Sequence, residues 1–500
     1  MSIFADDVIL FLKPVETEMR LCVDLLDAFG QASGLRVNLA KTSAVPIRCL
    51  EDQSRLIAAS LGCTIGAFPC KYLGLPLSIR KLSASQLHDL VHQVVRSLEG
   101  ATLPISSRLT LIKSVLCAIP IHAMLALNIP QKTIKAISKI CRGFLWCGEA
   151  EANGGQCKVA WRLVCAPKWT GGLGIPDLSW LNYALQARWP WLQRTDASRP
   201  WAEFDIEVSH EARQIFQAAT STRVGNGKNA LFWEDRWIQG MRVQDLTPGL
   251  YMRVRKKVRA ARTIFEAMSN GAWAPDIGPD LDTTLLSEVF ELWERVMEVE
   301  LRPAIEDSTA WAWEANGIYS ARSAYAAKFW GMESAPFAEM AWSLKAPRQC
   351  RFFAWLAGRN RCWTSDHLAR RGLPHQVACP LCDQEPETLN HVLIQCVFAR
   401  VVWHQVFGAL GRPELTPEAS DTVVEWCNAC AQRAPSKKEA KDIRTMASLV
   451  LWELWKHRNA IVFEGATPST TVLIARVECE ARAWSTAGLL KGNLSSFLVM

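Results

Sequence analysis

The sequence predicts an α+β fold in which helices dominate, and three kinds of pattern carry that prediction. Two short β-prone apolar runs, Ile3-Phe4 and Val8–Leu12, flank an acidic pair near the N-terminus, as in two short buried strands joined by a tight turn. Helical patterns follow over Glu16–Ala32, over most of Ser83–Trp146 and over Leu449–Phe463. A Cys-x2-Cys pair, followed by a histidine and a third cysteine, adds a small metal-binding module.

The composition is that of a globular chain with room for roughly two to four domains. Of its 500 residues, 49% are hydrophobic and 21% are charged. The 17 cysteines are scattered, and the first dozen residues carry acids where a secretory signal would be basic. We therefore expect an intracellular protein, in the nucleus or cytoplasm, whose cysteines are mostly small buried hydrophobes. The most apolar stretch, Ser114–Pro130, is interrupted by prolines and too short for a bilayer, so we expect no membrane partner.

Basic residues gather in blocks, although the net charge is only +7. Residues 71–146 hold ten Lys or Arg against Asp89 and Glu99, and residues 345–371 hold seven against Asp366. A third block, residues 251–262, holds six with no acid. Such blocks fit a polyanionic partner such as RNA or DNA. A solvated basic face is the alternative for any single block.

The acidic pair Asp6-Asp7 is the first candidate site. Two adjacent carboxylates against apolar strands are stabilised by a nearby cation, and hard oxygen ligands suit Mg²⁺. Two such ions, roughly 3.5–4 Å apart, can bind the attacking and leaving oxygens of a phosphoryl transfer. The alternative is an ordinary hairpin with Asp at its turn, where Asp is common.

Phe4-Ala5-Asp6-Asp7 resembles the aromatic-x-Asp-Asp hairpin in the palm of reverse transcriptases, and nearly the whole chain resembles a plant LINE-type (non-LTR) retrotransposon polyprotein. The resemblance implies that Asp6 and Asp7 are catalytic and bind Mg²⁺. It also implies that the chain begins within its catalytic domain, because the family carries a further catalytic aspartate on a strand well upstream. We therefore expect this polypeptide to be truncated and unable to polymerise alone.

Two further segments resemble parts of the same palm. Gly34–Asn38 followed by Lys41-Thr42 resembles the family's Gly-Leu-x-x-Asn-x-x-Lys-Thr segment, which implies that Lys41 lies near the triphosphate; a surface lysine is the alternative. Lys71–Leu75 resembles the hairpin that grips the primer, which implies substrate contacts at Tyr72 and Gly74. Glycine there would allow close backbone approach.

The resemblance also divides the chain. It implies a partial palm at 1–80, a thumb-like helical region at 81–195, a connector of unclear fold at 196–310, a zinc-binding domain at 311–410 and a helical region at 411–500. Gly171–Leu178 lacks the Lys-Ser/Thr of a P-loop and is interpreted as a turn. Val224–Gly227 is interpreted as a hairpin turn, and the 22 tryptophans mainly as core residues.

The cysteine-rich module carries four candidate metal ligands in a C-x2-C-x8-H-x4-C pattern, namely Cys379, Cys382, His391 and Cys396. Three thiolates and one imidazole complete a tetrahedral set with no open position, which is typical of structural rather than catalytic zinc. The alternative is four buried residues in a reduced core. The stretch resembles the zinc-binding domain found downstream of plant LINE reverse transcriptases.

Arginines lie among aromatic residues just before the cysteines, and the candidates are Arg348, Arg351, Arg359 and Arg361. This interleaving suits single-stranded nucleic acid, because cations bind the backbone while rings stack on bases. The alternative is an amphipathic helix that packs on the zinc module. Both interpretations hold if one face of the helix packs on the module and the other face binds nucleic acid.

These patterns favour a fragment of a retrotransposon RNA-directed DNA polymerase that retains the Asp-Asp hairpin and a structural zinc module. The alternative is a nucleic-acid-binding zinc module without catalysis, with RNA, DNA or their hybrid as partner. A scaffold with no nucleic-acid role is a third hypothesis, which salt-dependent binding to single strands would separate from the second.

Overall fold

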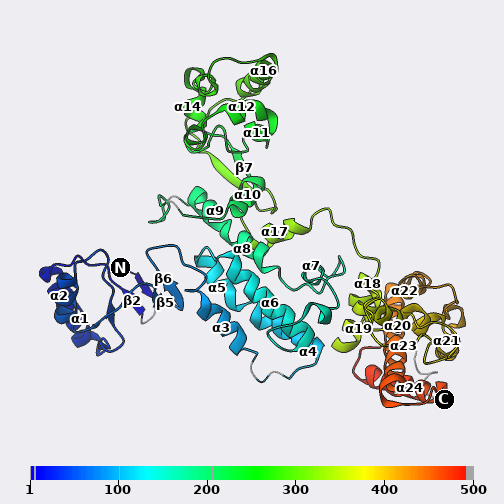
Figure 1. The fold of residues 1–500 in the computed structure, drawn as a ribbon. Coiled ribbons are helices and arrows are strands. Elements are labelled where there is room, and N and C mark those ends of the chain that lie inside the picture. The colour runs from blue at the N-terminus through cyan, green and yellow to red at the C-terminus, as the bar shows by residue number, and fades with distance from the viewer. Residues whose placement is uncertain are drawn as a thin grey trace. The chain divides into compact units, whose positions relative to one another are not determined.

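The computed structural model of this chain describes residues 2–4, 7–98, 100, 102–196, 198–204 and 206–490. Helices dominate, and the strands within these residues form four two-stranded sheets (Figure 1). The prediction of a mainly helical α+β chain is therefore confirmed. The chain divides into two compact units, Met1–Arg96 with Ile129–Ile137, and Ser97–Asn128 with Ser138–Met500.

The first unit opens on a β-hairpin. Strand β1 (Ser2–Phe4) pairs antiparallel with β2 (Asp7–Ile9), in a register that places Phe4 opposite Asp7. The predicted burial of these strands is wrong, because the Phe4 side chain is 64% exposed and that of Val8 is 49% exposed. A sheet of two strands offers each side chain few neighbours, and an isolated hairpin is marginally stable at best.

Helices α1 (Glu16–Ser33) and α2 (Glu51–Leu61) pack on each other in the same unit. Helix α1 ends where Gly34 takes a φ of +75° and donates its N–H to the Gly30 carbonyl, a left-handed helix end that glycine favours. The other short elements of the unit are β3 (Ser43–Ala44), which pairs parallel with β4 (Thr64–Ile65), and α3 (His88–Arg96).

A second hairpin forms where the sequence predicted one, from β5 (Cys70–Tyr72) and β6 (Leu75–Leu77). Leu73 and Gly74 take φ values of +51° and +77°, and positive φ at both central positions is the pattern of a type I′ turn. A Cβ at Gly74 would meet nothing within 4 Å. The positive φ of the turn, and not close packing against described residues, therefore explains why glycine suits position 74.

The second unit begins with a helical run made of α4 (Ile105–Leu111), the π-helical η1 (Ile112–Leu116) and α5 (Ile119–Ala126). By length and composition this run could cross a membrane, whereas the sequence pattern predicted an interruption at Pro120. The proline lies in the first turn of α5, where its missing N–H costs no helical hydrogen bond. Parts of the run pack on other helices, α4 on α19 and α5 on α8, and 33% of its most apolar window is buried.

The glycine cluster after α7 (Trp161–Val164) forms a turn, as predicted. Gly171 takes a φ of +79°, and a Cβ at Gly172 would lie 1.9 Å from the Ala166 carbonyl oxygen. Close backbone packing therefore excludes a side chain at Gly172. The neighbouring helices are α6 (Gln131–Cys147), η2 (Gly154–Gln156), α8 (Leu178–Gln186), α9 (Arg188–Thr195) and α10 (His210–Ala219).

Residues 224–301 enclose a hydrophobic core of their own, in which Trp233 and Trp273 are fully buried. This supports the core interpretation of those tryptophans. The core lies in sequence between β7 (Thr220–Arg223) and β8 (Ser308–Trp311), which pair antiparallel. Its helices are α11 (Val243–Leu246), α12 (Pro248–Arg253), α13 (Lys256–Arg259), α14 (Ile264–Met268), η3 (Ser269–Gly271), α15 (Ala274–Ile277) and α16 (Thr283–Met297).

The predicted hairpin turn at Val224–Gly227 is wrong, because β7 pairs with the distant β8 and not with the segment after the turn. The Asp307 carboxylate, just before β8, orders this loop instead. It accepts backbone N–H groups at 2.7–3.0 Å from four loop residues, Gly225, Gly227, Asn229 and Ala230.

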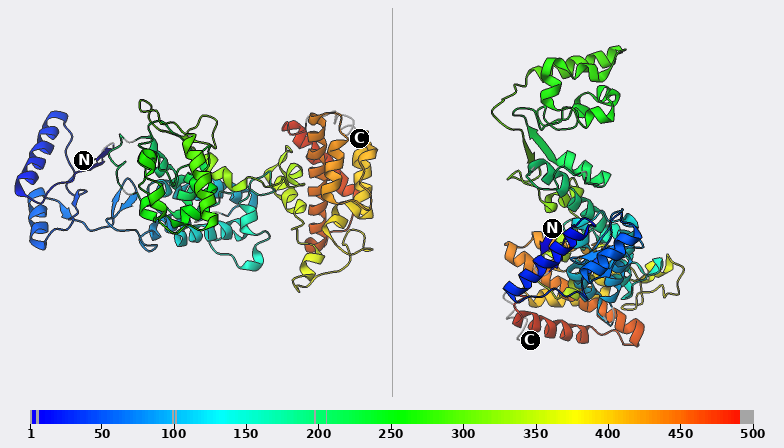
Figure 2. Two further views of the ribbon diagram at one scale, coloured as in Figure 1. Left: turned by 90° about the horizontal axis from the view of Figure 1, so that it is seen from above. Right: turned by 90° about the vertical axis from the view of Figure 1, so that its left-hand side faces the viewer.

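The C-terminal part is a helical bundle in which α23 (Lys437–Glu464) contacts α19 (Arg348–Gly358), α22 (Val423–Gln432) and α24 (Thr470–Thr486). Figure 2 shows these helices side by side. The remaining elements are α17 (Ala321–Ala326), η4 (Ala327–Phe329), α18 (Ala338–Trp342), α20 (Ser365–Ala369), the π-helical η5 (His391–Gln395), α21 (Val397–Ala409) and η6 (Pro413–Leu415).

Candidate metal centre and basic pocket

The first two candidate ligands, Cys379 and Cys382, lie in a tight loop closed by its own backbone. The Cys379 N–H donates to the Glu385 carbonyl at 2.8 Å, and the Asp383 N–H donates to the Cys379 carbonyl at 2.8 Å. Asp383 takes a φ of +54°, a conformation that Asp tolerates better than most residues. An isolated β-bridge between Ala378 and Pro386 closes the base of the loop. Both cysteines are therefore held by local geometry.

His391 and Cys396 lie at the two ends of the π-helical turn η5. The Cys396 N–H donates to the His391 carbonyl at 2.8 Å, a bond between residues five apart. The His391 N–H is fixed by the Thr388 hydroxyl at 3.1 Å. Cys396 then occupies the N-cap position of α21. The wider π-turn brings together two side chains that an α-helix of the same length would rotate apart.

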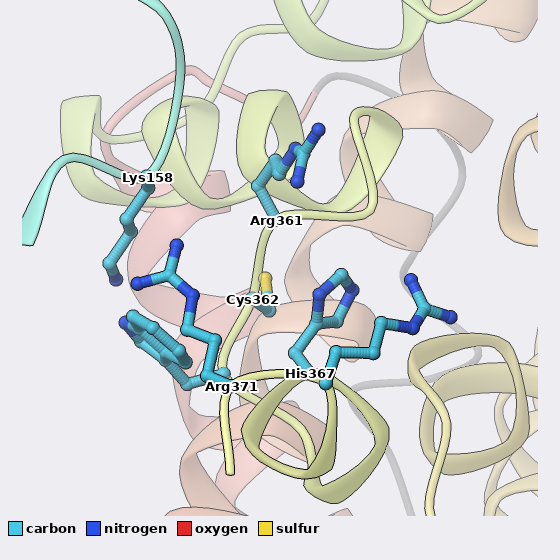
Figure 3. A pocket seen from close by; sticks show the side chains of 7 residues that line it. Lys158, Arg361, Cys362, His367 and Arg371 are labelled. Atoms are coloured by element: carbon cyan, nitrogen blue, oxygen red, sulfur yellow. The ribbon is translucent and has the colours of Figure 1, made fainter. Parts of the chain in front are cut away.

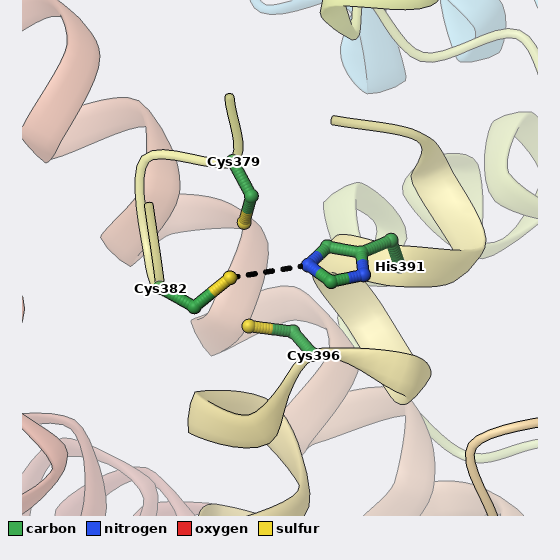
Figure 4. A group of neighbouring side chains, drawn as sticks. All are labelled: Cys379, Cys382, His391 and Cys396. Atoms are coloured by element: carbon green, nitrogen blue, oxygen red, sulfur yellow. Dashed lines mark hydrogen bonds between the residues drawn. The ribbon is translucent and has the colours of Figure 1, made fainter. Parts of the chain in front are cut away.

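The four side chains converge on one point (Figure 4). Their ligand atoms all lie within 4.8 Å of one another, and the Cys382 Sγ is 3.4 Å from the His391 Nε2. Zinc–sulfur bonds of about 2.3 Å in a tetrahedron place ligand atoms about 3.7 Å apart. Small side-chain rotations would therefore close the group around one ion. Cys379 and Cys396 are fully buried, as in a closed structural site.

The electrostatics of the group also suit a cation. A hydrogen bond from Cys396 lowers the pKa of the Cys379 thiol to about 4; burial opposes this shift, and a bond from His391 adds to it. The Cys379 thiolate in turn raises the pKa of His391 to about 9. Negative charge is thus favoured on the Cys379 sulfur even without a metal, whereas the hydrogen bond that Cys396 donates to it raises the pKa of the Cys396 thiol. Thiolate is the form that binds zinc.

A buried ion pair fixes the loop between the two halves of the site. Glu387 accepts from the Arg458 guanidinium at 2.5 Å (Nε to Oε1) and 2.9 Å (Nη2 to Oε2). The Glu387 and Arg458 side chains are 1% and 4% exposed. The same carboxylate accepts the Ser365 N–H at 3.0 Å and the Ser365 hydroxyl. Glu387 therefore connects the metal loop to both α23 and α20.

The four arginines predicted to bind nucleic acid differ in their contacts and in their exposure. Arg359 donates to the Gly171 carbonyl at 2.6 Å (Nη2) and 3.0 Å (Nε), and its guanidinium lies over the Phe337 ring. Arg348 is exposed and donates to the Thr110 hydroxyl at 3.1 Å. Arg351 is half-buried, whereas Arg361 is exposed and lines a pocket. The aromatic face of α19 is buried against the bundle, which supports the packing alternative for that helix.

A basic pocket lies beside α20 (Figure 3). Its volume is about 120 Å³, and it is lined by Lys158, Arg361, Cys362, Trp363, His367, Arg370 and Arg371. A neighbouring hollow of about 570 Å³ shares Lys158, Trp363 and Arg371 and adds Trp146. Burial lowers the pKa of His367, and Arg370, Arg361 and Arg371 lower it further, while Asp366 raises it. Positive charge therefore dominates this region.

The sequence predicted one member of this pocket as a site residue, Arg361. Arg370 and Arg371 belong to the basic block at residues 345–371, but the sequence pattern did not assign them to a site. Lys158 carried no local signal, because only the fold brings it to α20. The Glu387–Arg458 pair was missed for the same reason.

The predicted palm residues are described only in part. Asp6 lies outside the described residues, and Asp7 is exposed at the start of β2. Lys41 is exposed in a turn, and Tyr72 is half-buried at the end of β5. Their assignment to magnesium, triphosphate and primer stays a prediction.

Comparison with known proteins gives three matches. Residues 319–403, which include all four candidate zinc ligands, match the family described as zinc-binding in reverse transcriptase. An Arabidopsis thaliana protein named for ribonuclease H is 25% identical over 431 residues, which cover 78% of this chain and 66% of the relative. An uncharacterized mitochondrial protein of the same species is 26% identical over 145 residues, which cover 24% of this chain and 93% of the relative. The chain thus spans just under two thirds of the length of the first relative.

Proposed function

We propose that this chain belongs with the retrotransposon-type reverse transcriptases, as part of an RNA-directed DNA polymerase in which it binds nucleic acid around a structural zinc module. The observation that carries the proposal is the convergence of Cys379, Cys382, His391 and Cys396 inside the matched segment. The donor set of three thiols and one imidazole fits Zn²⁺.

The zinc site supplies structure and not chemistry. All four tetrahedral positions would be taken by protein ligands, so a bound ion could not activate a water molecule. The ligands come from the loop at Cys379–Cys382 and from the two sides of η5, and the ion would join them. Zinc at such a site contributes on the order of 10 kcal/mol to folding.

Nucleic-acid binding is supported by the basic character of the surface near the module. Arg361, Arg370 and Arg371 are exposed around one pocket, with Asp366 as the acid beside them. Phosphate contacts of this kind position a strand without reading its sequence. Binding to RNA and DNA single strands should therefore be similar in strength and should weaken steeply with salt.

The experiment is a titration of the full-length chain against labelled single-stranded RNA and DNA of mixed sequence, followed by fluorescence anisotropy at several salt concentrations. We expect the logarithm of the affinity to fall linearly with the logarithm of salt concentration. Absence of binding at low salt would overturn the nucleic-acid role and favour a scaffold.

Polymerisation is tested separately. We propose that these 500 residues bind nucleic acid without extending a primer by themselves, since two-metal phosphoryl transfer needs more carboxylate ligands than Asp6 and Asp7 provide. Template-directed extension above that of an Asp6→Ala, Asp7→Ala variant would contradict this part of the proposal. It would leave the zinc and binding parts intact.

A further inference from the structure

The basic pocket beside α20 combines unpaired cations with the ring of Trp363. Arg371 is held in place by the Gly155 carbonyl, which accepts from its Nη1 at 2.5 Å, and its guanidinium lies 4.4 Å from the centre of the Trp363 ring. Arg370 pairs with Asp366 at 3.3 Å. Among the residues described, the side chains of Lys158 and Arg361 have neither an acidic partner nor a hydrogen bond.

The balance of charge favours an anion in this pocket. Four permanent or near-permanent cations line it, Lys158, Arg361, Arg370 and Arg371, and one of them is neutralised by Asp366. Lys158 is half-buried, and that burial lowers its pKa. A partly buried cation without a counter-charge is unfavourable, and an acceptor-only ligand such as phosphate would remove that penalty while using the free donors.

The neighbouring hollow has the features of a binding site for a planar ring such as a nucleobase. Trp146 lines it, and within the described part of the chain the Trp146 Nε1 is buried with no acceptor. Trp363 is half-buried and lines both cavities. The volume of about 570 Å³ falls in the range of roughly 300–1,000 Å³ that small-molecule sites occupy, which is ample for one nucleobase.

We propose that this pocket seats one phosphate of a single-stranded nucleic acid between Lys158, Arg361 and Arg371, with the adjoining base against Trp363. The inference deepens the proposed function and rests on it, because it names where the strand is bound. Arg371 is already positioned by Gly155 and Trp363, so less side-chain entropy is lost when phosphate binds.

The metal loop holds one wall of the pocket. Glu387 accepts from the N–H and hydroxyl of Ser365, the first residue of α20, and α20 carries His367 and leads into Arg370 and Arg371. Zinc would therefore order the phosphate site through Glu387 without touching the ligand. The wall on the other side comes from Gly155 and Lys158, some 200 residues earlier in the chain.

The test uses the full-length chain with a 5′-labelled mixed-sequence 12-nucleotide DNA strand. Lys158→Gln combined with Arg361→Gln removes the two unpaired charges, and Arg400→Gln, an exposed residue of α21, removes a charge elsewhere in the matched segment. We expect the double variant to bind roughly tenfold more weakly at low salt, and the salt slope to fall by at most about 0.7, since the pocket holds one phosphate and each single-strand phosphate contact contributes roughly 0.7. The Arg400→Gln variant should stay within about twofold of the unchanged chain.

The outcomes separate the inference from the proposed function. If the unchanged chain binds and the double variant binds equally well while retaining zinc and its melting temperature, the strand lies elsewhere and the inference fails alone. If the unchanged chain does not bind the strand, both the inference and the proposed function fail. The unchanged chain should bind a strand with abasic sites more weakly than the intact strand. A Trp363→Leu variant should bind the abasic and the intact strands equally well. Equal loss in both proteins would overturn the stacking part.

Discussion

Arg458 forms a bidentate ion pair with Glu387, 71 residues earlier in the chain, and both side chains are almost completely buried. The pair joins the loop between the second and third candidate zinc ligands to the longest helix of the described chain, α23. Glu387 also accepts two hydrogen bonds from Ser365. Its carboxylate is therefore fully satisfied, which is the condition under which a buried ion pair persists.

The first prediction concerns this pair. Arg458→Met should lower the free energy of unfolding by about 3–5 kcal/mol, because it leaves the Glu387 carboxylate buried without its cation. The double variant Arg458→Met, Glu387→Met should recover part of the loss, since two apolar side chains replace the pair. Urea unfolding followed by tryptophan fluorescence measures both. Arg400→Met, on an exposed part of α21, is the matched control and should change the stability by less than about 0.5 kcal/mol. A loss below 1 kcal/mol in Arg458→Met would show that the pair does not hold the loop.

The second prediction is a pH dependence in the core of residues 224–301. Burial raises the pKa of Asp307, but backbone N–H donors from Gly225, Asn229, Gly227 and Ala230 lower it, and the net shift is downward. The folded-state pKa therefore lies below the unfolded value of about 3.9. The associated stability is present above that value and is lost as the pH falls through the folded-state pKa.

Asp307→Asn removes both the charge and that pH dependence. Each carboxylate oxygen accepts two of the four N–H groups, whereas asparagine has one acceptor oxygen and an NH2 group that cannot accept the other two. We therefore expect a loss of about 2–4 kcal/mol at neutral pH. Acid unfolding monitored by the fluorescence of all the tryptophans, which include Trp233 and Trp273 in this core, should show the difference between the two proteins shrinking below about pH 4. A constant difference down to pH 2 would contradict the role given to the carboxylate.

The third prediction separates the two interpretations of Arg359. Its guanidinium donates to the Gly171 carbonyl and contacts the Phe337 ring, which places it in the packing of α19. Arg359→Met should therefore lower the unfolding free energy by about 1–3 kcal/mol, with oligonucleotide affinity changed less than twofold. Parallel urea unfolding and anisotropy titrations decide the matter. An unchanged stability with a tenfold weaker affinity would restore Arg359 to the nucleic-acid surface.

Local patterns were readable from the sequence, and long-range pairing was not. The cysteine and histidine spacing predicted a group that the structure brings together, because its ligands lie within 18 residues of one another. The hairpin at Gly74 was likewise predicted from its own few residues, and its turn has the backbone conformation that glycine favours. Each depends on a few neighbouring residues.

The failures share one physical cause. Val224–Gly227 has the composition of a hairpin turn, but β7 finds its partner in β8, and a remote aspartate orders the loop. The apolar runs of β1 and β2 predicted burial, which depends on neighbours that no local pattern specifies. Lys158 and Arg361 meet at one pocket from segments about 200 residues apart, and neither segment encodes the other.

The last prediction addresses the zinc site through its ligands. Cys396→Ser should abolish tight zinc binding and expose the bundle around α21 and α23, because one thiolate of the closed set is lost. Cys479→Ser changes an exposed cysteine of α24 and should leave zinc content and melting temperature unchanged. A Cys396→Ser protein that keeps its zinc and its stability would remove Cys396 from the ligand set.

Metal analysis of the full-length chain, purified without added zinc and before and after chelation, tests the central claim most directly. The account predicts one zinc per chain, and loss of cooperative unfolding in residues 340–490 when the metal is removed. A chain that contains no metal and yet unfolds cooperatively in that region, with Cys379, Cys382 and Cys396 all reactive toward thiol reagents, would contradict it.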